Sequence, residues 1–163
     1  MSLVKTFLAL AAAAIACSSL NAQGVVMQHN VSLGMAKTIA EATLGECKSK
    51  GFHTSVAVVD RSGAILVLMR DEQAGTHTAE MARRKANTAR MFRTTTLEFQ
   101  KRTAPDQPLA AQRNVGDALA LGGGVPILMG TEVIGGVGSA GSNLETDDAC
   151  AKAGVAKVAD LLK

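Results

Sequence analysis

The 163-residue sequence contains no tryptophan and no tyrosine, and its only aromatic residues are 4 phenylalanines. Binding surfaces for single-stranded nucleic acid stack bases on aromatic side chains, so the chain lacks the residues for such a surface. The net charge of +3 is also too small for a surface that binds polyanions over the whole protein. These absences argue against a nucleic-acid partner and leave a core built from aliphatic side chains.

Common cofactor and nucleophile motifs are absent as well. The glycine run at residues 122–124 has no G-x-G-x-x-G framing, and no Lys and Ser/Thr pair follows it. These features argue against a phosphate loop and a dinucleotide fold, and the run more simply allows a tight turn into the second hairpin. Ser62 lies in no G-x-S-x-G motif, and a turn position explains both Ser62 and Asp60. Catalytic residues are therefore unknown from the sequence.

The N-terminal apolar run, from Phe7 to Cys17, is too short to span a bilayer. Lys5 precedes it, and a polar segment ending at Ala22 follows it, which is the three-part plan of a secretory signal. We predict a signal peptide over residues 1–22, one domain over residues 23–163, and a periplasmic or secreted protein. A lipid anchor on Cys17 is the alternative. Neither alternative leaves a membrane span in the mature chain.

The remaining sequence predicts an α+β fold, with an antiparallel sheet of about four to five strands flanked by helices. Val56–Val59 and Ile65–Met69 read as two strands, and the intervening Asp60–Gly63 has the residues of a hairpin turn. Both strands are apolar at odd and even positions, so we expect both faces of each to be covered. A second hairpin is predicted over residues 125–134, with Pro126 at a strand start or a sheet edge.

Two terminal helices should cover one face of this sheet. Ser32 is a candidate N-cap for the first, which should end at Gly51. Ser142 and Glu145 match a capping box at the start of the last helix. Cys47 and Cys150 lie on these two helices, and they could form a disulfide or remain as buried free thiols.

A helix from about Ala79 to Phe92 should cover the other face. The hydroxyls of Thr76 and Thr78 are candidate N-caps for it. Its alanines form a stripe of small residues that lets another backbone approach closely, and its polar face is basic. The glycine-rich strand at residues 135–141 likewise needs close access to its backbone by a helix, a ligand or another subunit. Basic residues gather in this part of the chain: Arg83, Arg84, Lys85, Arg90, Arg93, Lys101 and Arg102.

Four separated blocks occur in the order VAVVDRSGAILVLMRDEQAG, ARRKANTA, LALGGGVPI and DDACAKAG. With these blocks the chain resembles the GlcG/HbpS-like haem-binding family, also called haem-degrading proteins, over nearly all of its length after the first two dozen residues. The resemblance implies a small profilin-like α+β domain, large homo-oligomers, and haem or a related tetrapyrrole as ligand in some members. It also implies a haem ligand from the N-terminal helix region, although this chain has no histidine between Ser32 and Lys50.

We predict that haem, if bound, lies near the start of the basic helix. His77 or His29 would be the axial ligand, because imidazole binds haem iron. Arg83, Arg84 and Arg90 would bind the propionates, although the same arginines could pair with acidic residues of a neighbouring subunit. The alternatives for the histidines are an exposed loop position for His77 and a flexible tail for His29.

His77 and Glu80 are also the candidate metal ligands, because they are three residues apart and could share a metal ion. His53 opens a strand, and we expect it to be structural. Strands that are apolar on both faces, together with the glycine-rich backbone, further predict a homo-oligomer.

Three classes of function stay open on the sequence. The leading hypothesis, which rests mainly on the resemblance, is an exported haem- or tetrapyrrole-binding protein in haem or iron handling or in haem degradation. A small-molecule enzyme that uses the His77 and Glu80 region is the alternative. The third is a non-catalytic oligomeric accessory protein that binds no ligand.

Overall fold

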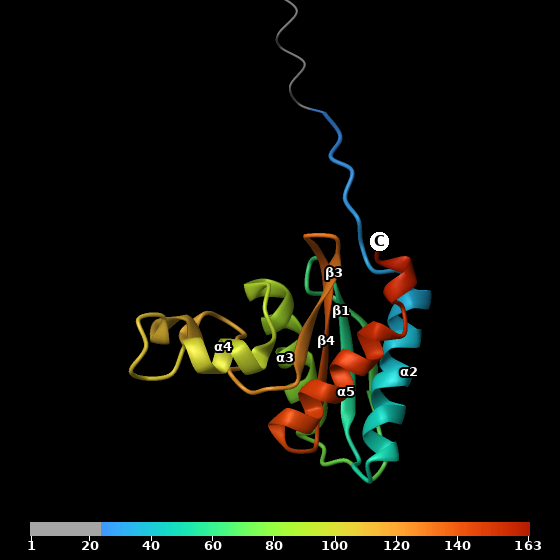
Figure 1. Ribbon diagram of the computed structural model, residues 1–163, viewed down its shortest axis with the longest axis vertical. Coiled ribbons are helices and arrows are strands. Elements are labelled where there is room, and N and C mark those ends of the chain that lie inside the picture. The colour runs from blue at the N-terminus through green and yellow to red at the C-terminus, as the bar shows by residue number, and fades with distance from the viewer. Residues whose placement is uncertain (1–23) are drawn as a thin grey trace, which may run out of the picture.

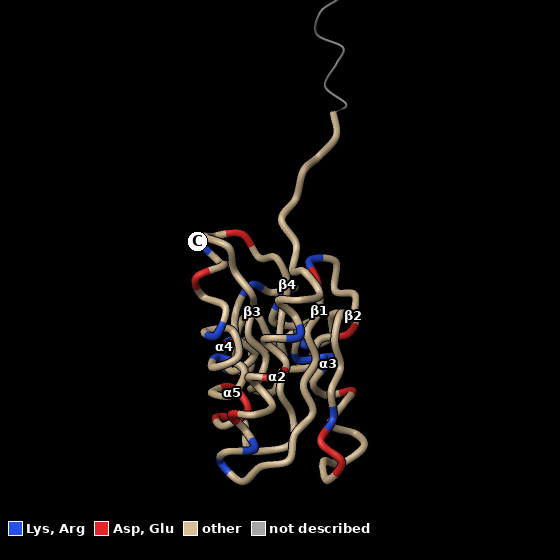
Figure 2. Tube along the Cα trace, turned by 90° about the vertical axis from the view of Figure 1, so that its right-hand side faces the viewer, with Lys and Arg blue, Asp and Glu red and all other residues tan. Residues whose placement is uncertain are grey.

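The computed structural model describes residues 24–163, so the signal peptide predicted over residues 1–22 lies outside the described residues. Four strands form one antiparallel sheet in the order β2-β1-β4-β3. Figure 2 shows them side by side in this order. Their bounds are Ser55–Asp60 for β1, Ile65–Arg70 for β2, Gly124–Met129 for β3 and Glu132–Ala140 for β4. The predicted α+β class with an antiparallel sheet is confirmed.

Helices cover both faces of the sheet (Figure 1). Helices α2 (Leu33–Ser49) and α5 (Leu144–Ala156) pack on one face, and α3 (Thr78–Phe92) packs on the other, as predicted. The short helix α4 (Thr96–Arg102) follows α3. Two 3-10 segments complete the described chain, at Ala110–Asn114 and Ala159–Leu161. Within residues 24–163, no helix combines the length and the apolar character needed to cross a membrane.

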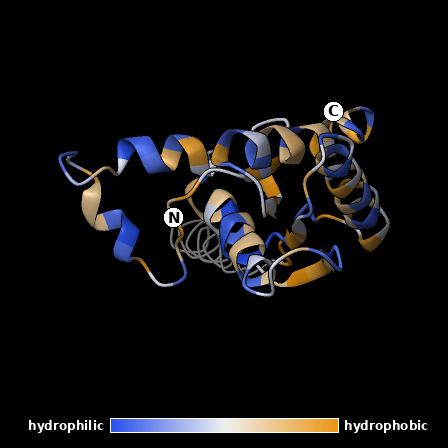
Figure 3. Cartoon of the chain, turned by 90° about the horizontal axis from the view of Figure 1, so that it is seen from below, coloured by the Kyte–Doolittle hydropathy of each residue, from blue (hydrophilic) through white to orange (hydrophobic). Residues whose placement is uncertain are grey.

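Strand β1 lies between β2 and β4 and contributes to two cores. Val56 and Val58 belong to the cluster under α2 and α5, whereas Ala57 and Val59 belong to the cluster under α3. All four side chains are 0% exposed. Strand β1 is apolar at both odd and even positions because helices cover both of its faces. Figure 3 shows hydrophobic and hydrophilic positions mixed along the helices, as expected for elements with one buried side.

Strand β2 corrects one prediction, because it is an edge strand and its faces are only partly covered. Ile65 and Leu68 are each 47% exposed. Apolar positions alone could not separate a central strand from an edge strand. The turn before β2 is confirmed: Oδ1 of Asp60 accepts hydrogen bonds from the backbone N–H groups of Ser62 at 2.8 Å and Ala64 at 2.9 Å. Gly63 there has a φ of 94°.

The glycine-rich part of β4 lies directly under α3. A Cβ atom added at Gly138 would collide with the backbone oxygen of Ala82, and one added at Gly136 would collide with that of Ala86. Ala82 and Ala86 are themselves 0% exposed. A helix, rather than a ligand or a second subunit, is therefore what requires these glycines.

Two predicted helix caps are wrong. The N-cap of α3 is His77, without a side-chain cap bond, and the hydroxyl of Thr78 instead donates to the carbonyl oxygen of Gly75 at 2.7 Å. The N-cap of α5 is Asn143 rather than Ser142. The Ser142 hydroxyl donates to Asp147 at 2.7 Å, because a buried carboxylate needs donors more than an exposed helix end does.

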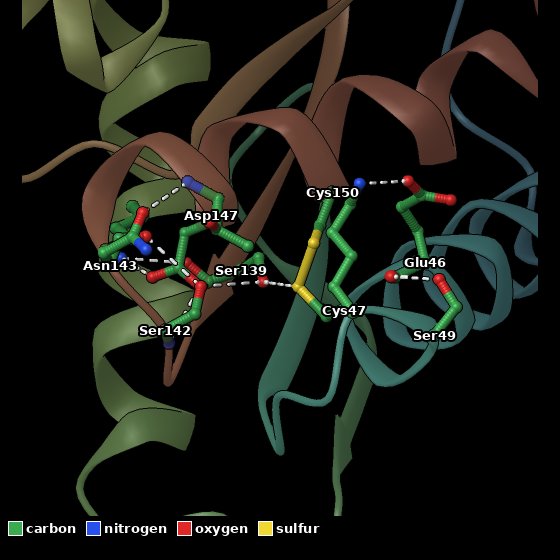
Figure 4. The surroundings of a disulfide bond; sticks show 11 residues. Glu46, Cys47, Ser49, Ser139, Ser142, Asn143, Asp147 and Cys150 are labelled. Carbon is green, nitrogen blue, oxygen red and sulfur yellow. Dashed lines mark hydrogen bonds and ion pairs between the residues drawn. A yellow bond between two sulfur atoms is a disulfide. The ribbon is translucent and has the colours of Figure 1, made fainter.

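A disulfide joins Cys47 on α2 to Cys150 on α5, with their Cα atoms 5.5 Å apart (Figure 4). Both residues are 0% exposed. The bond resolves the two alternatives left by the sequence, and it ties together the two helices that cover the same face of the sheet.

Candidate functional site

A cavity of about 480 Å³ opens at the end of the sheet where β1 begins and β4 ends. Helices α3 and α5 both start at this end, so their first residues line the opening. The lining combines apolar, imidazole and buried charged side chains, among them Phe52, His53, His77, Met81, Lys85 and Asp147. This cavity is the candidate site.

Two imidazoles line the cavity. His77 lies directly before α3, and its ring packs against Gly75: a Cβ atom added there would lie 2.7 Å from Cε1 of the ring. Nδ1 of His53 is 3.0 Å from Oδ1 of Asp71. The backbone N–H of Gln73 and the side chains of Lys48 and His53 lower the pKa of Asp71, so this carboxylate is charged and fixes the His53 ring. His53, which the sequence treated as structural, therefore reaches the candidate site.

The cavity also contains a buried ion pair. Nζ of Lys85 lies 2.8 Å from Oδ2 of Asp147, and both side chains are 1% exposed. The same ammonium donates to the carbonyl oxygen of Ser139 at 2.9 Å. Burial lowers the pKa of Lys85, and the neighbouring carboxylate opposes that shift.

Asp147 is held by further donors on its other carboxylate oxygen. Oδ1 of Asp147 accepts from the backbone N–H of Ser142 at 3.2 Å and from the Ser139 hydroxyl at 3.4 Å. The Ser139 hydroxyl is also 3.6 Å from Sγ of Cys47, so the disulfide lies beside the hydrogen bonds of Asp147 (Figure 4). The cavity is therefore built on a hydrogen-bonded and cross-linked base.

Sequence reasoning missed Lys85 because it grouped this residue with the basic surface. Lys85 is three residues after Ala82 and four before Ala89, so it lies on the buried alanine stripe of α3. A lysine on the apolar stripe of a helix was the signal that could have identified it. Its partner Asp147 is 62 positions away, and no local pattern indicates that pairing.

The arginines lie outside the cavity lining and are engaged elsewhere. Nη1 and Nη2 of Arg83 donate to Asp117 at 2.6 and 2.8 Å, and Arg83 also binds both carboxylate oxygens of Glu80. Arg84 donates to the carbonyl oxygen of Ala118 at 2.8 Å. Hydrogen bonds from Arg83 lower the pKa values of Glu80 and Asp117. Glu80 is therefore a paired surface carboxylate, which disfavours its use as a general base at neutral pH.

The remaining predicted residues lie toward the opposite end of the sheet. Arg90 is near the C-terminal end of α3 and donates to the carbonyl oxygen of Arg61 at 3.2 Å. Nδ1 of His29 lies 2.8 Å from Oε2 of Glu132, the first residue of β4. The structure thus brings His77 to the cavity and places His29, Arg90 and the Arg83–Arg84 pair in other positions. Among residues 24–163, no three His, Cys, Asp or Glu side chains form a group that could hold a metal ion.

The family model described as haem degrading protein HbpS-like matches residues 31–156. The chain belongs to the HbpS-like family. The match spans the sheet, the three long helices and every residue that lines the cavity.

Solved structures agree with this HbpS-like assignment. The crystal structure of HbpS is 34% identical, with a TM-score of 0.76, and the match covers 82% of this chain and 93% of that one. The crystal structure of a PduOC:heme complex is 26% identical, with a TM-score of 0.72, over 78% of this chain and 94% of that one. The Klebsiella pneumoniae protein ORFY shares the fold at a TM-score of 0.80 and 24% identity, over 84% of this chain and 96% of that one.

Proposed function

We propose that this HbpS-like protein is an exported haem- or tetrapyrrole-binding protein and that the cavity at the start of α3 is its binding site. One observation carries the location: the cavity brings the imidazole of His77 next to an apolar wall that includes Phe52, Met81 and Leu144. Imidazole is a common axial ligand of haem iron, and apolar side chains pack against porphyrin faces. The relative whose structure is a PduOC:heme complex supports haem as the ligand class.

The cavity has residues that suit the iron and one face of a haem group, but it has fewer residues that suit the propionates. His77 would bind the iron, and His53, oriented by Asp71, is a second imidazole at the same cavity. The predicted propionate ligand Arg83 already pairs with Asp117 and Glu80, so a propionate would have to displace a carboxylate there. Bound haem would supply iron-centred redox and ligand-binding chemistry, while this chain would supply the imidazole donor and the apolar wall.

Titration of the purified protein with haemin, followed by Soret absorbance, tests the proposal. His77→Ala should weaken binding and shift the Soret band, because it removes the axial donor. His29→Ala is the matched control, because that imidazole lies near the other end of the sheet. Equal haemin affinity and spectrum in wild type and His77→Ala would reject the cavity. A changed spectrum in His29→Ala alone would move the site to His29.

The same proposal includes self-association. Edge strand β2 has five consecutive apolar residues, of which Ile65 and Leu68 are 47% exposed. An edge strand has unpaired backbone N–H and C=O groups that can bond to a strand of another chain. Strand β2 has no lysine or proline, the residues that often prevent such pairing. Light scattering of the protein should give a mass above one chain at micromolar concentration, and Leu68→Lys should lower it. A monomeric wild type would reject this part of the proposal.

A further inference from the structure

The buried lysine at the cavity, Lys85, has more N–H donors than it has acceptors among the described residues. A lysine ammonium carries three N–H donors. Lys85 uses one on the carbonyl oxygen of Ser139 and one on Asp147. These are its hydrogen-bond partners within residues 24–163. Lys85 is among the residues that line the cavity, and because a buried donor without an acceptor is unfavourable, its third N–H would gain from an oxygen acceptor that enters there.

The charge of Asp147 does not depend on Lys85 alone. Its Oδ1 atom accepts from the backbone and hydroxyl groups of Ser142 and from the Ser139 hydroxyl, while Lys85 contacts Oδ2. The ammonium can therefore take a second anionic partner without leaving Asp147 unpaired. The cross-linked base described above holds both groups in place.

The surroundings favour an anionic partner over a neutral one. Of the described residues that line the cavity, Asp147 is the only acid, and its charge is matched by Lys85. Helices α3 and α5 begin at the cavity and direct the positive ends of their dipoles toward it. The imidazoles of His53 and His77 add groups that donate hydrogen bonds. Phe52 and Met81 supply an apolar surface beside this polar base.

We infer that the cavity is a carboxylate site, in which Lys85 binds the carboxylate group of an amphipathic ligand whose apolar part lies against Phe52 and Met81. The carboxylate can come from a haem propionate or from a separate small organic acid. The first source rests on the proposed haem function, whereas the second does not. In either case Lys85, rather than the surface arginines, is the anion-binding residue.

Propionate and propionamide, titrated at constant ionic strength, test this inference directly, because they have nearly the same shape but different charge. Protein with [¹³C]methyl methionine reports the cavity through Met81, and Met27 serves as an internal control outside it. We expect the Met81 signal to shift saturably with propionate and at least tenfold more weakly with propionamide. Equal responses to the two compounds, or no response to propionate, would overturn the inference.

Variants separate Lys85 from other cations. Lys85→Met combined with Asp147→Leu removes both buried charges together and should abolish the propionate response. Lys101→Met is the matched control, because Lys101 is an exposed lysine that pairs with Glu98 outside the cavity. A folded double variant that binds propionate like wild type would reject the role of Lys85. If the double variant does not fold, the comparison of propionate with propionamide on wild type decides.

Haemin and its dimethyl ester then distinguish the two sources. If a propionate occupies the site, the ester should bind at least tenfold more weakly than haemin, and free propionate should compete with haemin. Binding of propionate without any binding of haemin would support the carboxylate site and reject the proposed haem function. The opposite outcome is that wild type shows no propionate response and a folded double variant binds haemin with wild-type affinity. That outcome would reject the carboxylate site but not the proposed haem function.

Discussion

At the end of the sheet where β1 begins, Lys85 and Asp147 form an ion pair whose side chains are each 1% exposed. At the opposite end, His29 and Arg61 share Glu132, and the three side chains are between 32% and 62% exposed. Both ends use the same kind of charged contact. The groups at the exposed end stay hydrated when a partner is lost, whereas in the buried pair removal of one charge leaves the other without a counter-charge.

This difference predicts that substitutions at the buried end reduce the stability of the fold more than substitutions at the exposed end. The buried end combines the ion pair with the disulfide and the cavity, so the stability of the fold and the proposed binding site depend on the same residues. The exposed end can change with little effect on folding. Four measurements can test this contrast between the buried and the exposed end.

Removal of Lys85 alone should have the largest effect. Lys85→Met leaves Asp147 buried without its cation and should lower the free energy of unfolding by about 3–5 kcal/mol. Adding Asp147→Leu should recover most of this loss, because no unpaired charge then remains. Urea denaturation followed by circular dichroism measures both. A loss below about 1 kcal/mol in the single variant would show that water reaches the pair.

Loss of the disulfide should come next. Replacing Cys47 and Cys150 with serine opens a connection between residues separated by 103 positions and should lower the free energy of unfolding by about 2–5 kcal/mol. A reducing agent should destabilise wild type and leave the serine variant unchanged. Alkylation of the denatured, unreduced protein should find neither cysteine free. Detection of both as free thiols would contradict the bond.

The partly exposed contact between Arg83 and Asp117 should give an intermediate, pH-dependent effect. Hydrogen bonds from Arg83 lower the pKa of Asp117 in the folded protein below its value in the unfolded chain, which is about 3.9. The stabilisation is therefore present above that pH and is lost as the pH falls through the folded pKa. Asp117→Asn should lower stability by up to about 1 kcal/mol at pH 7. The gap from wild type should begin to narrow below about pH 4 and close as the pH falls through the folded pKa. Thermal unfolding across this range measures the gap, and a constant gap would refute the assignment.

The exposed end should respond least. Glu132→Gln weakens its contacts with His29 and Arg61, and because all three side chains touch water, we expect no measurable change in the urea midpoint at physiological salt. The variant should show a difference from wild type only at low ionic strength. A large destabilisation at physiological salt would contradict the prediction that the exposed end contributes less to stability than the buried end.

The sequence was sufficient for the local elements of this HbpS-like protein. Helical spacing and Ser32 predicted α2, and the Asp60 turn predicted the first hairpin, because these features depend on residues close together in the chain. Pro126 correctly indicated a strand that starts at that point or lies at an edge. The burial of both faces of β1 also followed from its apolar residues at odd and even positions.

The caps show where local reasoning reached its limit. Ser142 and Thr78 have the residue types of helix caps, yet both hydroxyls bond elsewhere, Ser142 to the buried Asp147 and Thr78 to Gly75. The covered faces expected for β2 also depended on its position in the sheet, which no local pattern encodes. For Ser142 a tertiary contact outweighed the local preference, and for β2 the position in the sheet did, whereas Thr78 bonds within its own turn.

The candidate site was decided mainly by the tertiary structure. The sequence placed His77 at the start of a helix, but it could not bring His53 beside it, pair Lys85 with Asp147, or separate His29 and Arg90 from the cavity. Periodicity reports which side chains share one face of one element. Which faces then meet, and which charges lose their water, depends on packing between elements far apart in the chain, and that packing alone makes Lys85 a buried donor at a cavity.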